Sequence, residues 1–166
     1  PFYCFFFVHT LPSQTQYADV ILLSQAGQST SKWDVTYDSG SKTDEAVKAA
    51  KASDFVIVTR GGVEGHEGSD RQTLTLSDTN MNSVTDAIAA AVPSNKLALV
   101  VVVGEPVALE MYQDSYGAIV LALEGGQAAG TAFAEVIAGV TNPSGALPFT
   151  MCVVKCGYLF LQYGRG

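Results

Sequence analysis

Residues 97–103 form an apolar run with no polar interruption, and this run constrains the fold more than any other part of the chain. A strand that is apolar on both faces has to be covered on both faces. Such coverage is typical of a central parallel strand with helices on either side of its sheet. The run therefore predicts a buried strand inside an α/β protein.

The segments around this run alternate between strand and helix periodicity. Helical patterns are expected to begin at 43, to carry apolar residues between 81 and 92, and to run over 104–113 and 127–139. Further strands are expected at 33–37, 55–59 and 118–123. Alternating elements joined by short loops predict a three-layer α/β/α sandwich with a mostly parallel, doubly wound sheet.

Length and charge narrow the functional classes. A chain of 166 residues is one domain by length. Its net charge is −7 and it holds no run of lysine or arginine, which argues against a nucleic-acid partner. The apolar opening, residues 1–8, is too short to span a bilayer and lacks the basic flank of a signal peptide, so no membrane partner is expected and the compartment stays open.

A glycine-rich charged loop, residues 61–71, follows the strand expected at 55–59. Loops at the carboxyl ends of buried strands commonly carry the chemistry of α/β proteins. The loop matches neither G-x-G-x-x-G nor a phosphate-binding P-loop, so no nucleotide cofactor is expected. Glu64, His66, Glu67 and Asp70 offer oxygen and nitrogen donors, but carboxylates in a turn more commonly cap backbone N–H groups, and no metal is expected.

General acid/base chemistry suits the same loop better. A glutamate held beside other carboxylates has its pKa raised, as an acid working near neutral pH requires. On these residues alone, the choice between acid/base chemistry and a structural loop stays open.

Several short motifs, taken in order, resemble the carboxyl-terminal α/β sandwich domain of glycoside hydrolase family 3, which includes β-glucosidases and β-xylosidases. The motifs are E-G-x-D-R at 67–71, G-x-P-V at 104–107, G-Q at 126–127 and N-P-S-G-x-L-P at 142–148. The resemblance covers residues 34–150. Residues 1–33 match poorly and are compatible with one or two strands of the sandwich, while residues 151–166 form a non-matching tail.

The resemblance implies a retaining β-glycosidase mechanism that needs two carboxyl groups. One is an aspartate nucleophile on a separate barrel domain. The other is the acid/base, which falls on Glu67, with Glu64 as the alternative because loop length varies in the family. Asp70 and Arg71 are expected to support the loop as a charge-assisted pair, with Arg71 a candidate for substrate contact. His66 belongs to the same group, and a solvent-facing role is preferred for it.

These 166 residues contain neither the barrel nor the nucleophile that the resemblance implies. We therefore expect a fragment that is inactive alone, acts on a β-linked glucoside or xyloside only together with a barrel, and self-associates through apolar surface that the barrel would cover. Two other functions stay open. One is a non-catalytic carbohydrate-binding or scaffold module, and the other is an unrelated flavodoxin-like binding domain.

Overall fold

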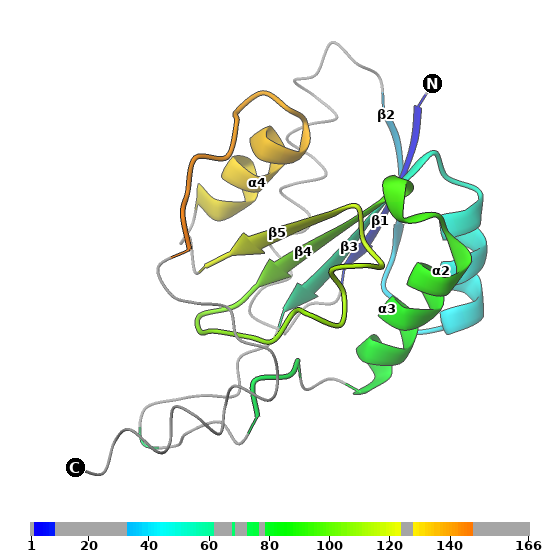
Figure 1. The fold of residues 1–166 in the computed structure, drawn as a ribbon. Coiled ribbons are helices and arrows are strands. Elements are labelled where there is room, and N and C mark those ends of the chain that lie inside the picture. The colour runs from blue at the N-terminus through cyan, green and yellow to red at the C-terminus, as the bar shows by residue number, and fades with distance from the viewer. Residues whose placement is uncertain are drawn as a thin grey trace.

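The computed structural model describes residues 2–8, 33–61, 68, 73–76, 79–123 and 128–147. Within these ranges, five strands form one parallel sheet in the order β2-β1-β3-β4-β5 (Figure 1). Their bounds are β1 Phe2–Val8, β2 Trp33–Asp38, β3 Phe55–Gly61, β4 Leu97–Val102 and β5 Ala118–Ala122. The strand order reverses between β1 and β3, so the sheet is doubly wound.

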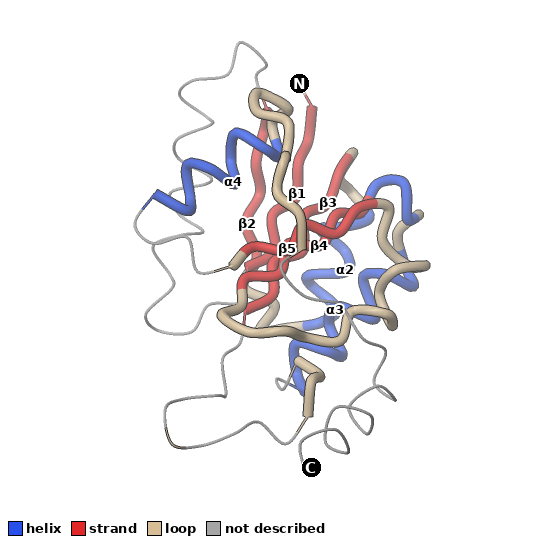
Figure 2. The backbone as a smooth tube through the Cα atoms, turned by 60° about the vertical axis from the view of Figure 1, so that its left-hand side comes forward, coloured by secondary structure: helices blue, strands red, loops and turns tan. Residues whose placement is uncertain are grey.

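Helices cover both faces of this sheet. The bounds are α2 Thr43–Lys51, α3 Thr79–Ala91 and α4 Ala129–Ile137, with a short 3₁₀ helix, η1, at Ser94–Lys96. Figure 2 shows α2 and α3 together on one side of the strands and α4 on the other. The predicted three-layer α/β/α sandwich with a parallel, doubly wound sheet is confirmed.

The core consists of two clusters, one on each side of the sheet. The larger cluster joins α2 and α3 to one face of β3 and β4, through Ala46, Ala50, Val56, Val58, Val84, Ile88, Leu99 and Val101. The smaller joins the other face to α4 through Ile57, Val100 and Ala134, with Phe133 packed against them. Neighbouring residues of β3 and β4 thus face opposite layers, which confirms the expectation that the run at 97–103 is buried on both sides.

The carboxyl end of α4 agrees with its sequence signal. Gly139 has a φ of +71°, in the left-handed region that a side chain would disfavour. Its N–H donates to the Val136 carbonyl at 3.1 Å, and the Val140 N–H donates to the Glu135 carbonyl at 2.9 Å. This pair of bonds is the Schellman motif, and it satisfies carbonyls that the helix end would leave without partners.

The prediction of a helix over 104–113 is wrong. Residues 106–109 have no regular structure, and residues 110–115 form turns. The reason is a tertiary bond: the Ala108 N–H donates to the Leu74 carbonyl at 2.8 Å instead of to a carbonyl one helical turn earlier. The contact with the distant segment outweighs the weak local preference for helix.

Strand β1 lies in the interior of the described sheet, between β2 and β3. Its residue Cys4 is level with Val35 of β2 and with Phe55 of β3. The described residues of the segment 1–33 are thus the strand β1 and the first residue of β2.

Gly117 closes the amino end of β4, and alanine at this position should destabilise the fold. Its N–H donates to the Ser94 and Leu97 carbonyls, and a Cβ built on it would lie 2.6 Å from the Ser94 carbonyl oxygen. Because that neighbour is backbone, Gly117→Ala should cost about 1–3 kcal/mol of unfolding free energy. Urea denaturation measures the loss. Gly145→Ala is the control, since a Cβ at Gly145 meets nothing within 4 Å, and equal midpoints for the two variants would contradict the prediction.

Candidate functional site

The carboxyl ends of β1 and β3 mark the place where the strand order reverses. In open α/β sheets, ligands bind in the crevice outside the carboxyl ends of the strands at such a switch point. Strand β3 ends at Gly61, the first residue of the charged loop. The sheet therefore directs this loop to the edge where α/β proteins place their sites, toward which β3, β4 and β5 all run in Figure 1.

The residues that the sequence predicts as acid/base or loop-supporting groups lie outside the described residues. They are Glu64, His66, Glu67, Asp70 and Arg71. Gly68 is described, and its φ of +89° places it in the left-handed region. A side chain at Gly68 would be strained by the backbone alone, although a Cβ there would meet no atom within 4 Å. The glycine directly after Glu67 thus has a conformational role in the loop.

Directly before the charged loop, Arg60 is completely buried. It is the last side chain of β3 before Gly61, and it points into the layer that holds α3. One guanidinium nitrogen, Nη1, donates to Thr85 Oγ1 at 2.9 Å, and Nη2 donates to Asn82 Oδ1 at 2.8 Å. A buried guanidinium needs such partners, because burying a charge without them is very costly.

We call the group around this arginine the Arg60 cluster: Arg60, Asn82, Thr85, Tyr112 and Tyr116. It joins the end of β3 to α3 and to the connection that follows β4. The Tyr112 hydroxyl lies 3.4 Å from Asn82 Oδ1, and the Tyr116 hydroxyl donates to the Thr85 carbonyl at 3.1 Å. Three segments that are distant in sequence are therefore joined by one polar group next to the start of the charged loop.

The two tyrosines of the cluster stay protonated at physiological pH. Burial raises the pKa of the Tyr112 hydroxyl, against an opposing effect of the Arg60 charge. Burial also raises the pKa of Tyr116, and the neighbouring Tyr112 adds to that rise. Their rings meet edge to face, with centroids 6.1 Å apart and planes 82° apart. Both hydroxyls can therefore act as hydrogen-bond donors near neutral pH.

The Asn82 side chain contacts the chain on both sides of the charged loop. Its Oδ1 accepts from Arg60 at 2.8 Å, and its Nδ2 donates to the Leu76 carbonyl at 3.1 Å. The orientation of the amide follows from its neighbours, because arginine can only donate and a carbonyl oxygen can only accept. One amide thus links the residue before the loop to the segment after it.

The segment after the loop, residues 73–76, is held a second time. The Leu74 carbonyl accepts the Ala108 N–H at 2.8 Å, and the side chain of Leu76 is buried in the larger core cluster. Val107 and Ala108 are buried as well. The connection after β4, which lacks the expected helix, therefore braces the exit of the charged loop.

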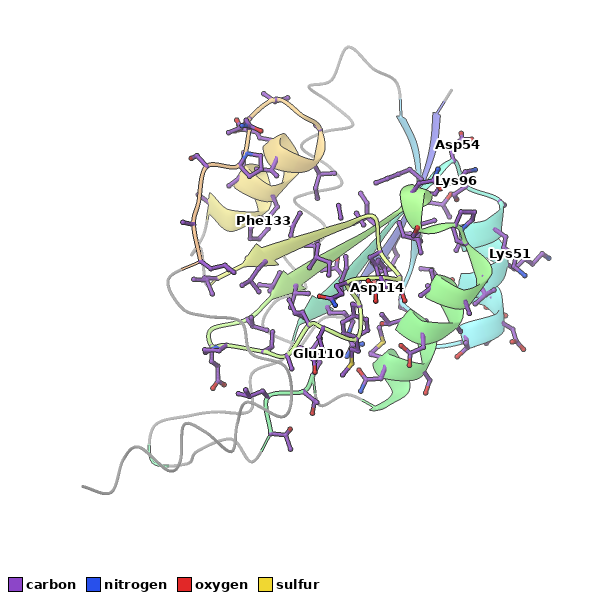
Figure 3. The ribbon with its side chains drawn as sticks, viewed as in Figure 1. Lys51, Asp54, Lys96, Glu110, Asp114 and Phe133 are labelled. Atoms are coloured by element: carbon purple, nitrogen blue, oxygen red, sulfur yellow. The ribbon has the colours of Figure 1, made fainter. Side chains whose placement is uncertain are left out.

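Some of the charged side chains of the described residues lie near the two ends of the sheet (Figure 3). Figure 3 shows Glu110 near the carboxyl ends of β3 and β4, and Asp54 and Lys96 at the opposite end. Glu110 is half-buried and lies at the end of the sheet where β3 ends (Figure 3). Within the described ranges, no three histidine, cysteine, aspartate or glutamate residues are grouped so that they could hold a metal ion. No helix in those ranges is both long and apolar enough to cross a membrane.

Sequence reasoning missed the Arg60 cluster, although two signals for it exist. Arg60 continues the alternation of Val56 and Val58, so it shares their buried face. Thr85 lies four residues after Met81 and three before Ile88, and therefore falls within the apolar stripe of α3. A polar residue on each of two facing buried stripes indicates a polar contact between them.

Comparison with known proteins finds one family over most of the chain. Residues 9–159 match the model described as the glycosyl hydrolase family 3 C-terminal domain, a range wider at both ends than the 34–150 of the motif resemblance. The periplasmic beta-glucosidase of Salmonella typhimurium is 37% identical over 109 residues, which are 64% of this chain and 14% of the relative. The probable beta-D-xylosidase 6 of Arabidopsis thaliana is 35% identical over 119 residues, 70% of this chain and 15% of the relative.

A solved structure agrees with these matches. The beta-glucosidase DesR of Streptomyces venezuelae, crystallised in complex with D-glucose, superposes with a TM-score of 0.60 at 30% identity. The likeness covers 67% of this chain and 14% of DesR. The chain thus spans about one seventh of the length of these proteins.

Proposed function

Because the chain belongs to glycosyl hydrolase family 3 and its residues 9–159 match the C-terminal domain, we propose that it supplies one half of a β-glycosidase active site. In this proposal the domain contributes the proton-donating glutamate. A barrel domain contributes the sugar pocket and the nucleophilic aspartate. The substrate class is a β-linked glucoside or xyloside, in line with the names of the relatives. Family membership also excludes an unrelated flavodoxin-like domain.

The proposed reaction is a double displacement at the anomeric carbon. The barrel's aspartate attacks that carbon while the glutamic acid protonates the departing glycosidic oxygen, and the same residue, now a carboxylate, then removes a proton from the water that releases the sugar. Glu67 is the proposed acid/base, and Glu64 is the alternative. The two carboxyl groups of a retaining pair stand roughly 5 Å apart, so the loop has to reach over the barrel's pocket.

The observation that supports this role is the anchoring of the charged loop at both ends. The Arg60 cluster holds its entrance, and Leu74 and Leu76 hold its exit. General acid catalysis requires the acid within hydrogen-bond distance of the leaving oxygen. A loop fixed at both ends, at the switch point of the sheet, can present a carboxyl group in this way.

The other polar residues of the loop are proposed as support. Asp70 and Arg71 form a charge-assisted pair that restrains the loop, and Arg71 is also a candidate contact for the substrate. His66, next to Glu67, is proposed to face solvent.

The 166-residue chain alone is expected to release no nitrophenol from a nitrophenyl β-glucoside. The reason is that one carboxyl group without its partner loses the advantage of positioning both groups on a single substrate. Nitrophenol absorbance measures the rate against buffer. The matched control is the Glu67→Gln chain. Hydrolysis by the unmodified chain that this substitution abolishes would contradict the need for a barrel.

A hybrid enzyme provides the positive arm of this test. In it, residues 9–159 replace the corresponding segment of the Salmonella typhimurium beta-glucosidase. The proposal expects β-glucoside hydrolysis by the folded hybrid. A hybrid that is monodisperse and binds glucose but hydrolyses nothing would favour a non-catalytic carbohydrate-binding or scaffold module.

A further inference from the structure

One side chain, Asn82, contacts the chain on both sides of the charged loop, and we infer that it is a positioning residue for the loop's entrance and exit. In this inference the Asn82 amide fixes the separation between the loop's entrance at Arg60 and its exit at Leu76. The catalytic meaning of this inference rests on the proposed function, whereas the restraint itself does not.

The first step is that Asn82 contacts both ends of the loop from one helix. It lies in α3, and its two amide atoms bond Arg60 at 2.8 Å and the Leu76 carbonyl at 3.1 Å. One planar group thus contacts Arg60, directly before the charged loop, and Leu76, in the segment that follows it. Fixing both ends of a loop removes a large part of its conformational freedom.

The second step is that α3 is itself a rigid support. Met81, Val84 and Ile88 are fully buried on either side of Asn82 along the helix. The hydroxyl of Thr85, the residue after Val84, accepts a hydrogen bond from Arg60 Nη1 and donates one to the Met81 carbonyl. The two contacts of Asn82 therefore hold Arg60 and Leu76 in place relative to a well-packed helix.

The third step is that the amide satisfies both neighbours at once, because its oxygen accepts and its nitrogen donates. Arg60 presents a donor and Leu76 an acceptor. Aspartate would accept from Arg60 but cannot donate to a carbonyl, and an aliphatic residue could do neither. Asn82→Asp therefore keeps the entrance contact and removes the exit contact with almost no change in shape.

Amide hydrogen exchange of the full chain at pH 7, followed by NMR, tests the inference. The reporter is the Ala108 N–H, which bonds the Leu74 carbonyl in the exit segment, and the reference is the Gly117 N–H, which bonds Ser94 and Leu97 at the other end of the same connection. Loss of one hydrogen bond corresponds to about a tenfold change in an opening equilibrium. Asn82→Asp should therefore accelerate Ala108 exchange about tenfold and leave Gly117 unchanged.

Asn95→Asp is the matched control, because it makes the same chemical change on an exposed residue of η1. It should leave the Ala108 rate unchanged. Asn82→Ala, which removes both contacts but favours helix, replaces Asn82→Asp if the latter does not fold. An unchanged Ala108 rate in the folded Asn82 variant would overturn the inference. Equal acceleration at Ala108 and Gly117 would also overturn it, because that result means general loosening.

The hybrid enzyme gives the catalytic readout. With Asn82→Asp, kcat/KM should fall more for an alkyl glucoside than for a dinitrophenyl glucoside, since only the alkyl leaving group needs a well-placed acid in the first displacement. If Glu67→Gln and Glu64→Gln both lack this dependence, the proposed function fails while the exchange result still decides the role of Asn82. If one glutamate variant shows the leaving-group dependence and Asn82→Asp does not, the positioning role of Asn82 is wrong and the proposed function stands.

Discussion

Replacing Glu67 by glutamine in the hybrid enzyme is expected to lower kcat/KM for an alkyl β-glucoside by about 10²–10⁴-fold, the usual contribution of general acid/base catalysis. An alkoxide leaves poorly unless it is protonated, so its departure depends on the acid. Dinitrophenolate leaves without help, and the loss in the first step should be much smaller for a dinitrophenyl glucoside. Initial rates with both substrates measure the difference.

Glu64→Gln is the matched control, since it changes the same chemical group three residues away in the same loop. It should lower the two rates by the same small factor. If Glu64→Gln shows the leaving-group dependence and Glu67→Gln does not, the acid/base is Glu64. If neither variant shows it, this loop does not supply the acid.

Truncation of Arg60 to alanine is expected to have the largest effect on stability among the described residues, about 3 kcal/mol or more. The substitution opens a cavity at a fully buried site and leaves Asn82 Oδ1 and Thr85 Oγ1 without their arginine donor. Urea denaturation of the full chain measures the loss.

Arg60→Lys provides an intermediate case, because lysine keeps the charge but cannot reach two acceptors with a planar fork. Lys96→Ala is the control, since Lys96 is an exposed cation in η1 and should change the midpoint little. A midpoint for Arg60→Ala equal to that of Lys96→Ala would show that the buried guanidinium adds nothing to stability.

The sheet could be predicted because a strand that is buried on both faces has an uninterrupted run of apolar residues in the sequence. The run at 97–103 has to be apolar at every position, and β4 is the strand that results. The amphipathic stripe of α3 is equally direct, with Met81, Val84 and Ile88 at helical spacing and buried. Gly139 also marked the end of α4 correctly, since a positive φ there needs glycine.

The connection after β4 could not be predicted because its structure depends on a distant partner. Gly104 and Pro106 are compatible with a helix start, but Ala108 donates to Leu74, more than 30 residues earlier in the chain. No local pattern contains that bond. The Arg60 cluster could not be predicted for a related reason. An arginine next to a charged loop is easily assigned to that loop, and only its hydrogen bonds to α3 show that it belongs to the core.

The place of β1 in the sheet has a consequence for how the chain folds. No neighbouring pair of described strands is joined by a hairpin, and β1 pairs with β2 and β3 only after the intervening chain has looped back. Each pairing therefore costs loop-closure entropy before its hydrogen bonds and core contacts compensate for it. Because β1 pairs with β2 on one side and with β3 on the other, a change that weakens β1 should loosen both pairings together.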